Sequence, residues 1–172
     1  MQQITLAATA EQLEYVREIR DEMARWDSAQ AQMIGYDPTE VLSLFYPVED
    51  QPSLGAAESN ERVWLLATYA GKAAGCAALQ RIDENTSELQ YVYVRNEFRG
   101  KRIGRLMVEK LVATSKAAGY STMRLQTVTY MKEARSLYKS LGFMPCEPFH
   151  SIPKIYAPAI IFMELPLAPT RK

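Results

Sequence analysis

The sequence is poor in the side chains that metal centres and nucleophilic triads usually need. Its 172 residues include one histidine, His150, and two cysteines, Cys76 and Cys146. The cysteines lack the close spacing of zinc ligands, and one pair in a chain of this length does not indicate a disulfide scaffold. We expect both to be small buried side chains and expect no metal site. His150 has no acidic residue nearby in a suitable register, so a Ser-His-Asp triad is not supported.

Net charge and long apolar runs are absent as well. Lys and Arg together number 20, as do Asp and Glu, so the formal net charge is zero and broad attraction to nucleic acid is not expected. No apolar stretch approaches membrane-spanning length, and residues 1–4 do not begin a secretory signal. These features predict a cytoplasmic protein that binds neither nucleic acid nor membrane. We expect a monomer or a homodimer.

Against this overall balance, positive charge is concentrated in residues 95–105. This segment has five basic residues and one acid, Glu97, which gives a local charge of +4. A strand-like alternating run, 88–94, precedes it, and an amphipathic helical pattern follows from Ile103 to a stop at Gly119. Amides at a helix N-terminus lack partners, and the helix dipole adds about half a positive charge there. We expect a ligand with several phosphates to bind here.

The spacing of the glycines narrows the kind of ligand. No Gly-Lys-Ser/Thr follows, as a Walker loop would need, and the three glycines of a dinucleotide fingerprint are not all present. Residues 99–104 instead resemble the Arg/Gln-x-x-Gly-x-Gly/Ala loop of the GNAT superfamily of N-acetyltransferases. Arg99 fills the first position and Gly104 the last. Arg102 stands at the middle glycine, which matters only if the backbone there needs a positive φ or open space.

A second motif supports the same resemblance. Residues 134–143, Ala-Arg-Ser-Leu-Tyr-Lys-Ser-Leu-Gly-Phe, are similar to the family's A-x-x-L-Y-x-x-x-G-F signature. The two motifs occur in the family's order and spacing. The resemblance implies a twisted mixed sheet that binds acetyl-CoA as co-substrate. Backbone groups of three strand residues would meet the pantetheine arm, and the following loop would hold the pyrophosphate. The strand residues are Val92, Tyr93 and Val94, and those of the loop are Arg99, Gly100, Lys101, Arg102, Ile103, Gly104 and Arg105.

The resemblance also implies two catalytic residues. Tyr138, at the motif tyrosine, would protonate the departing thiolate, although a tyrosine at helical spacing is often part of the core edge. Glu88 matches the glutamate base of histone-type members, although a glutamate at a strand edge is often simply solvated. Gln126, where other members carry a second glutamate, cannot serve as a base. His150 is either a surface residue or part of the acceptor pocket.

The order of elements predicts an α/β fold with a mixed, partly parallel central sheet of six to seven strands flanked by helices. Thr9 and Gln12 form a capping-box pattern before a first helix. The charged residues of this helix, Arg20 among them, are mostly expected to face water. Two strand–helix–strand crossings, one on each side of strand 122–128, indicate parallel pairing. Residues 46–60 read as a loop, and 159–167 as the last strand. No linker suggests a second domain, so 1–172 is predicted to be one acetyltransferase domain.

The predicted function is acetyl-CoA-dependent N-acetyl transfer to a primary amine of a small molecule or peptide, by direct attack in a ternary complex. The alternative is a non-catalytic CoA-binding or sensor domain on the same fold. Gln126 leaves it open, as does Met131, which replaces an asparagine that often contacts CoA in the family. A purely structural protein would leave the local +4 charge without a purpose. The acceptor amine is not determined by the sequence.

Overall fold

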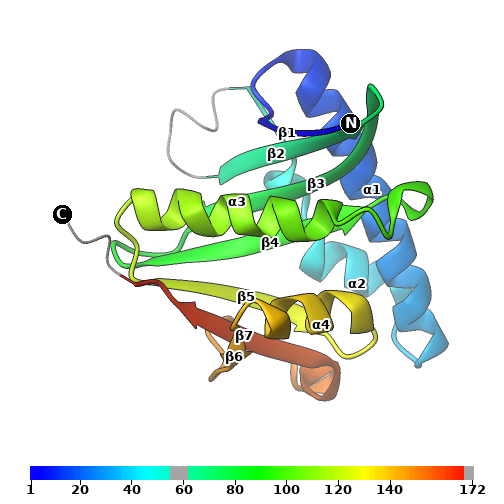
Figure 1. Cartoon of the computed structure of the whole chain (residues 1–172). Coiled ribbons are helices and arrows are strands. Elements are labelled where there is room, and N and C mark those ends of the chain that lie inside the picture. Colours follow the sequence, from blue (N-terminus) through cyan, green and yellow to red (C-terminus); the bar gives the residue numbers. More distant parts are fainter. Residues whose placement is uncertain (55–61, 169–172) are drawn as a thin grey trace. The chain divides into compact units, whose positions relative to one another are not determined.

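The computed structural model describes residues 1–54 and 62–168 of the chain, which form the helices and strands labelled in Figure 1. In chain order these are β1 (Gln2–Leu6), α1 (Ala10–Met33), α2 (Pro38–Phe45), β2 (Arg62–Tyr69), β3 (Lys72–Arg81), β4 (Thr86–Val94), α3 (Ile103–Ala117), β5 (Thr122–Val128), α4 (Lys132–Ser140), β6 (Met144–Pro145) and β7 (Ile160–Pro166). Short 3-10 segments cover Val48–Asp50, Asn96–Phe98 and Lys154–Ala159. The loop predicted over 46–60 contains the first of these segments, and its residues 55–60 lie outside the described residues.

The strands form a seven-stranded sheet with the order β1-β2-β3-β4-β5-β7-β6, which confirms the predicted mixed architecture. β4 and β5 pair in parallel, as expected for strands joined by a crossover helix, with Glu88 opposite Arg124. The second predicted parallel crossing is wrong, because β7 runs antiparallel to β5. The chain forms β6 after α4 and then turns back before it enters the sheet again, which reverses the last strand.

The contacts divide the chain into two compact units. Unit 1 comprises residues 1–78 and 91–107, and unit 2 comprises residues 79–90 and 108–172. The prediction of one acetyltransferase domain over 1–172 stays a prediction. No helix within the described ranges is both long and apolar enough to span a membrane.

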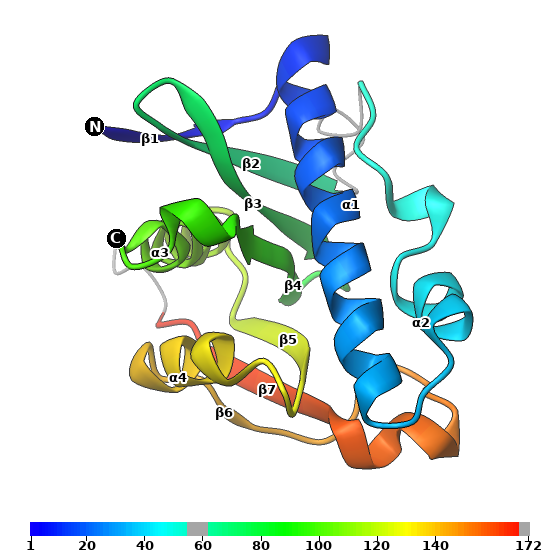
Figure 2. The ribbon, with the colours of Figure 1, turned by 90° about the vertical axis from the view of Figure 1, so that its right-hand side faces the viewer.

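In unit 1, the predicted capping box begins α1. The Thr9 hydroxyl accepts from the Gln12 amide, and the Gln12 side chain accepts from the Thr9 amide. Helix α1 packs on β2 (Figure 2), and its apolar side joins a core cluster with buried residues of β2 and β3. The members of this cluster are Ala7, Leu13, Val16, Ile19, Trp64, Leu66, Cys76 and Ala78. Arg20 was expected to face water, but its side chain is 2% exposed, because Tyr46 and Tyr91 lie against its guanidinium.

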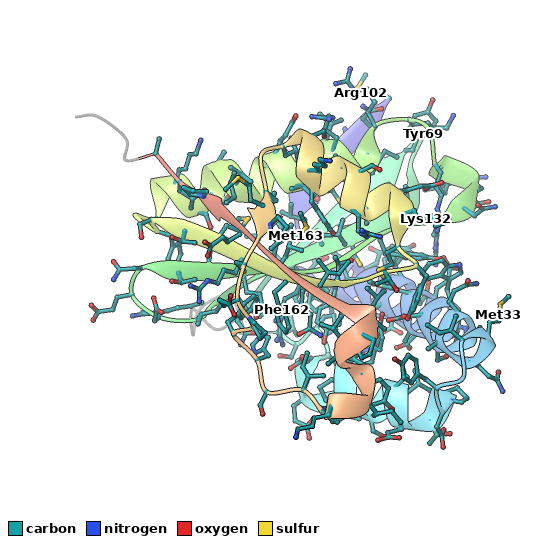
Figure 3. The ribbon with its side chains drawn as sticks, turned by 90° about the horizontal axis from the view of Figure 1, so that it is seen from below. Met33, Tyr69, Arg102, Lys132, Phe162 and Met163 are labelled. Atoms are coloured by element: carbon teal, nitrogen blue, oxygen red, sulfur yellow. The ribbon has the colours of Figure 1, made fainter. Side chains whose placement is uncertain are left out.

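In unit 2, side chains alternate across β5. Met123, Leu125 and Thr127 are buried, while the residues between them, Arg124 and Gln126 included, are partly exposed. α4 ends at Ser140, two residues before Gly142, whose φ of 99° favours glycine. Lys132 at the start of α4 and Phe162 and Met163 in β7 are labelled in Figure 3.

Candidate active site

The basic loop of unit 1 has two residues in the left-handed backbone region. Gly100 has a φ of 79° and Arg102 has a φ of 63°. A Cβ added at Gly100 would meet no heavy atom within 4 Å, so glycine serves the backbone there rather than the space. The middle position of the motif therefore does require a positive φ, and the arginine that replaces glycine there adopts it at a cost of about 1–2 kcal/mol.

The first turn of α3 provides the backbone groups of this loop. The Leu106 amide donates to the Arg102 carbonyl at 3.1 Å, which is the first bond of the helix. Amides that precede it in the helix have no acceptor within the helix, so they suit an anion. Gly104 lies at the second position of α3, and Ile103 is 1% exposed. Ile103 can thus contribute its backbone but not its side chain to a ligand.

The cations of this segment do not all belong to the loop. The guanidinium of Arg95 pairs with two carboxylates of α1: its Nη2 lies 3.7 Å from Glu18 Oε2, and its Nε lies 3.6 Å from Glu22 Oε1. Part of the local +4 charge is therefore neutralised within unit 1. Arg99 and Lys101 lie over the rings of Tyr93 and Tyr69, with distances to the centroids of 5.6 and 4.9 Å. Tyr69 and Arg102 lie at the same end of this unit (Figure 3). The exposed residues Lys101 and Arg102 keep positive charge at the loop.

The strand residues predicted to meet pantetheine lie beside this loop. The Arg99 Nε donates to the Val94 carbonyl at 3.1 Å, so this carbonyl already has a donor, whereas we expected it to be open to a ligand. A Cβ at Gly75 would come within 2.7 Å of the Tyr93 carbonyl oxygen, so glycine allows β3 to approach β4 closely here. Gly75 was not selected from the sequence as a site residue, although an isolated glycine in a strand pattern indicates a close approach of another backbone.

Tyr91, just before these strand residues, has a φ of 51°, which is rare for an aromatic residue inside a strand and typical of a bulge. Its hydroxyl donates to Asp50 at 2.7 Å, and its ring stacks on Trp64 at 5.4 Å. Burial and the Asp50 carboxylate raise the pKa of Tyr91 above its ordinary value. These contacts fix the irregular backbone of β4. No sequence signal marked this position, because the conformation depends on packing.

In unit 2, the structure brings together two of the residues considered from the sequence. His150 Nε2 lies 2.8 and 3.0 Å from the two carboxylate oxygens of Glu88, and Gln90 donates to the same carboxylate at 3.1 Å. The Glu88 side chain is 6% exposed and that of His150 42%. The alternative interpretation, in which Glu88 is simply solvated, is therefore wrong, and the imidazole of His150 lies against the carboxylate. The hydrogen bond from Glu88 raises the pKa of His150, although burial opposes this shift.

Tyr138 is buried, with an exposed fraction of 6%, and its ring packs edge-on against Phe143 at 5.8 Å. Burial raises the pKa of Tyr138, so the phenol keeps its proton at neutral pH. Within residues 1–54 and 62–168, no hydrogen-bond partner of this hydroxyl is found. The side chain therefore lies in the core edge, as the alternative interpretation held, and retains the proton that a general acid needs.

A hollow of about 540 Å³ opens beside this part of unit 2. Its walls come from β5, β7, β6 and the segment after β6, and consist of Arg124, Pro145, Cys146, Glu147, Pro148 and Glu164. Arg124 and Glu164 pair at 3.3 Å across the strands. Cys76 is fully buried as expected, but Cys146 is only partly buried, because it lies on the wall of this hollow. No cluster of His, Cys, Asp or Glu within the described ranges is arranged to hold a metal ion.

Comparison with known proteins places this arrangement in a family. The profile of the acetyltransferase (GNAT) family matches residues 20–143. The chain is 33% identical to the IAA acetyltransferase of Azospirillum brasilense over 130 residues, which cover 73% of this chain and 83% of that protein. It is 35% identical to an uncharacterised N-acetyltransferase of Schizosaccharomyces pombe over 99 residues, but this match spans 57% of the chain and 59% of that relative's length.

Solved structures show the same fold at low identity. The PaiA N-acetyltransferase of Thermoplasma acidophilum, solved in complex with coenzyme A, superposes with a TM-score of 0.73 at 20% identity, covering 96% of this chain and 99% of that one. A putative acetyltransferase of Salmonella typhimurium, solved with acetyl-CoA, has a TM-score of 0.67 at 17% identity, covering 99% of this chain and 96% of that one. With both motifs, the seven-stranded mixed sheet and the matched profile, the chain belongs to the GNAT family of acetyltransferases.

Proposed function

We propose that the protein is an acetyl-CoA-dependent N-acetyltransferase that acts on a primary amine of a small molecule or peptide by direct attack in a ternary complex. The observation that carries this proposal is the loop of residues 99–105, with its two left-handed residues, its exposed cations and the helix start that follows. A pyrophosphate needs several donors and positive charge in one place, and this loop supplies both.

The residues of unit 1 fit such a ligand. Gly100 permits the left-handed backbone of the loop, and no heavy atom lies within 4 Å of the position of its absent Cβ, so the space above the loop is open to a ligand. Lys101, Arg102 and Arg105 supply the charge, and the first amides of α3 supply directed donors. Val92 and Tyr93 are expected to pair with pantetheine as an added strand does. Val94 is expected to contribute its amide, because its carbonyl accepts from Arg99.

The reaction moves one acyl group and takes two protons from the ammonium nitrogen. The amine nitrogen forms a bond to the acetyl carbon, the bond from that carbon to sulfur breaks, and the electron pair leaves with the sulfur. The ammonium must lose one proton before its nitrogen can attack. The nitrogen loses a second proton as the amide forms, and the departing thiolate gains one, so the net release is a single proton. Alignment of the two reactants is expected to supply much of the rate, about 7–11 kcal/mol in favourable systems.

Two groups of unit 2 are proposed for the proton transfers. Tyr138 holds a proton at neutral pH and is proposed to pass it to the thiolate. The Glu88–His150 pair is proposed to accept the proton of the amine, since a buried carboxylate that holds an imidazole is an arrangement that binding alone does not need. This pair favours turnover over the alternative, a CoA-binding or sensor domain.

The test is to measure release of free CoA thiol from acetyl-CoA with a panel of primary amines, with the acetylated product identified by mass. Amine-dependent release that matches product formation supports the proposal. Binding of acetyl-CoA without turnover on any amine would favour the sensor function, and absence of binding would contradict both. The cytoplasmic location and the monomeric or homodimeric state stay predictions from the sequence.

A further inference from the structure

The pair of Glu88 and His150 is asymmetric in its access to solvent. The carboxylate is 6% exposed and the imidazole 42%, although the two groups lie only 2.8 Å apart at their nearest atoms. The imidazole therefore covers the carboxylate. A molecule that arrives from solvent meets His150 before it meets Glu88.

The hydrogen bond decides which ring nitrogen carries the proton. An ionised carboxylate can only accept, and Nε2 lies within hydrogen-bond distance of both its oxygens. In the neutral ring, Nε2 therefore holds the hydrogen and Nδ1 holds the lone pair. Within the part of the chain that the structure describes, no hydrogen bond to Nδ1 is found.

We propose that His150 accepts the proton of the acceptor amine at Nδ1, and that Glu88 is a positioning residue that fixes the tautomer through Nε2. This inference rests on the proposed function and specifies which member of the pair meets the substrate. The proton moves from the ammonium nitrogen to Nδ1, the Nε2 hydrogen stays on the ring, and the imidazolium later loses its new proton to solvent. No oxidant or further reactant is needed.

The surroundings hold the ring and leave Glu88 as its main charged neighbour. Phe149 packs against His150 with ring centroids 4.7 Å apart, and Phe162 of β7 packs edge-on against Phe149 at 5.1 Å. Arg124 of β5 lies over the ring of Phe149 and pairs with Glu164 of β7, and Glu147 belongs to the same segment as His150. Among charged groups, Glu88 alone raises the pKa of His150, so the ring is a stronger base than an ordinary histidine.

A pair with a purely structural role would form the same hydrogen bond. The test therefore needs a measurement, such as the tautomer and the titration midpoint of His150, that depends on the chemistry of the ring. The chain has a single histidine, so nitrogen-detected NMR reports on His150 without assignment. We expect the neutral ring to carry its hydrogen on Nε2 and to titrate above pH 6.5, and Glu88→Gln to lower that midpoint. A neutral ring with its hydrogen on Nδ1 overturns the proposal even if no variant folds.

Kinetics distinguish the two candidate bases. If His150 is the base, kcat/KM rises with pH through the midpoint that NMR gives for the ring, and Glu88→Gln moves both midpoints down together. His150→Gln keeps a donor for Glu88 but has no basic nitrogen. We therefore expect it to lower kcat/KM at least tenfold and to abolish the rise of kcat/KM with pH at the midpoint of the ring. If Glu88 is the base, His150→Gln stays within about threefold of wild type, which overturns the proposal.

Controls separate this inference from the proposed function and from misfolding. Lys154→Gln alters an exposed residue just after the same segment and is expected to match wild type. Each variant should show the wild-type thermal shift with acetyl-CoA, because the cofactor contacts are proposed for unit 1. If wild type turns over no amine, the proposed function fails, and the NMR result still decides the tautomer. If wild type is active and His150→Gln equals it, only the role of His150 fails.

Discussion

The loop of residues 99–105 and the Glu88–His150 pair serve one proposed reaction but are built in opposite ways. The loop is a run of consecutive residues, exposed at Arg99 and Gly100, and it offers mainly backbone amides and a helix start. The pair joins residues 62 positions apart, and it works through side chains, one of them buried. A site made of backbone tolerates side-chain replacement where the dihedral angles permit, and a site made of two side chains does not.

Arg102 and Glu88 illustrate this difference. Arg102 replaces the motif glycine and still adopts the required φ of 63°, so the loop keeps its form with an added cation. Glu88 is covered on one side by a ring from a distant segment. Loss of His150 would therefore expose the carboxylate, and loss of Glu88 would leave the imidazole without its hydrogen-bond partner. Substitutions in the loop should therefore act on acetyl-CoA binding, and substitutions in unit 2 should act on turnover.

The largest effect is expected from Gly104→Glu. A carboxylate at the second position of α3 would repel the pyrophosphate, so the rise in melting temperature with acetyl-CoA should disappear. An acidic residue in the first turn suits the helix dipole, so the protein without ligand should stay folded. The measurement is differential scanning fluorimetry with and without acetyl-CoA, and an unchanged shift would exclude this loop as the phosphate site.

Tyr138→Phe should lower kcat at least tenfold and leave the acetyl-CoA shift intact. The ring keeps its packing against Phe143 while the proton donor is lost, so the effect should fall on the transition state. Removal of a buried hydroxyl should not lower stability by more than about 1 kcal/mol. Steady-state kinetics with the best acceptor decides, and turnover within about twofold of wild type would make Tyr138 a core residue only.

The histidine should make stability depend on pH. Because the pKa of His150 is raised in the folded state, its contribution is complete below the unfolded pKa and is lost as pH rises through the folded pKa. Wild type should therefore exceed His150→Gln by more at pH 5.5 than at pH 9, by about 1 kcal/mol or less, since the ring is partly exposed. Urea unfolding of both proteins at both pH values measures this, and a larger difference at pH 9 would reverse the assigned shift.

The smallest effect compares two positions of the loop. Gly100→Ala places a side chain at a φ of 79° and should destabilise by about 1 kcal/mol, whereas Arg102→Gly removes one from 63° and should stabilise by a few tenths of that. Arg102→Gly should also weaken acetyl-CoA binding modestly, because one cation is lost. Thermal unfolding measures the change in stability of each variant, and a binding isotherm measures its affinity for acetyl-CoA. If both substitutions change the stability in the same direction, backbone strain does not govern this loop.

Local spacing predicted much of the fold. The capping box of Thr9 and Gln12 and the helix stop at Gly119 depend on interactions within a few residues, and both are confirmed. The parallel pairing of β4 and β5 follows from the crossover helix. The reversal of β7 did not follow, because two residues of β6 are too short a signal to mark the turn back.

The sequence by itself determined the family, the mixed sheet and the place of the basic loop, because motif residues lie close together and act through the backbone that they share. Only the tertiary structure decided that Tyr91 adopts a left-handed conformation, that Arg20 is buried between aromatic rings and that His150 holds Glu88. Each of these depends on side chains brought together from distant segments by burial. No spacing rule encodes such a contact, since it arises from the packing of the whole unit.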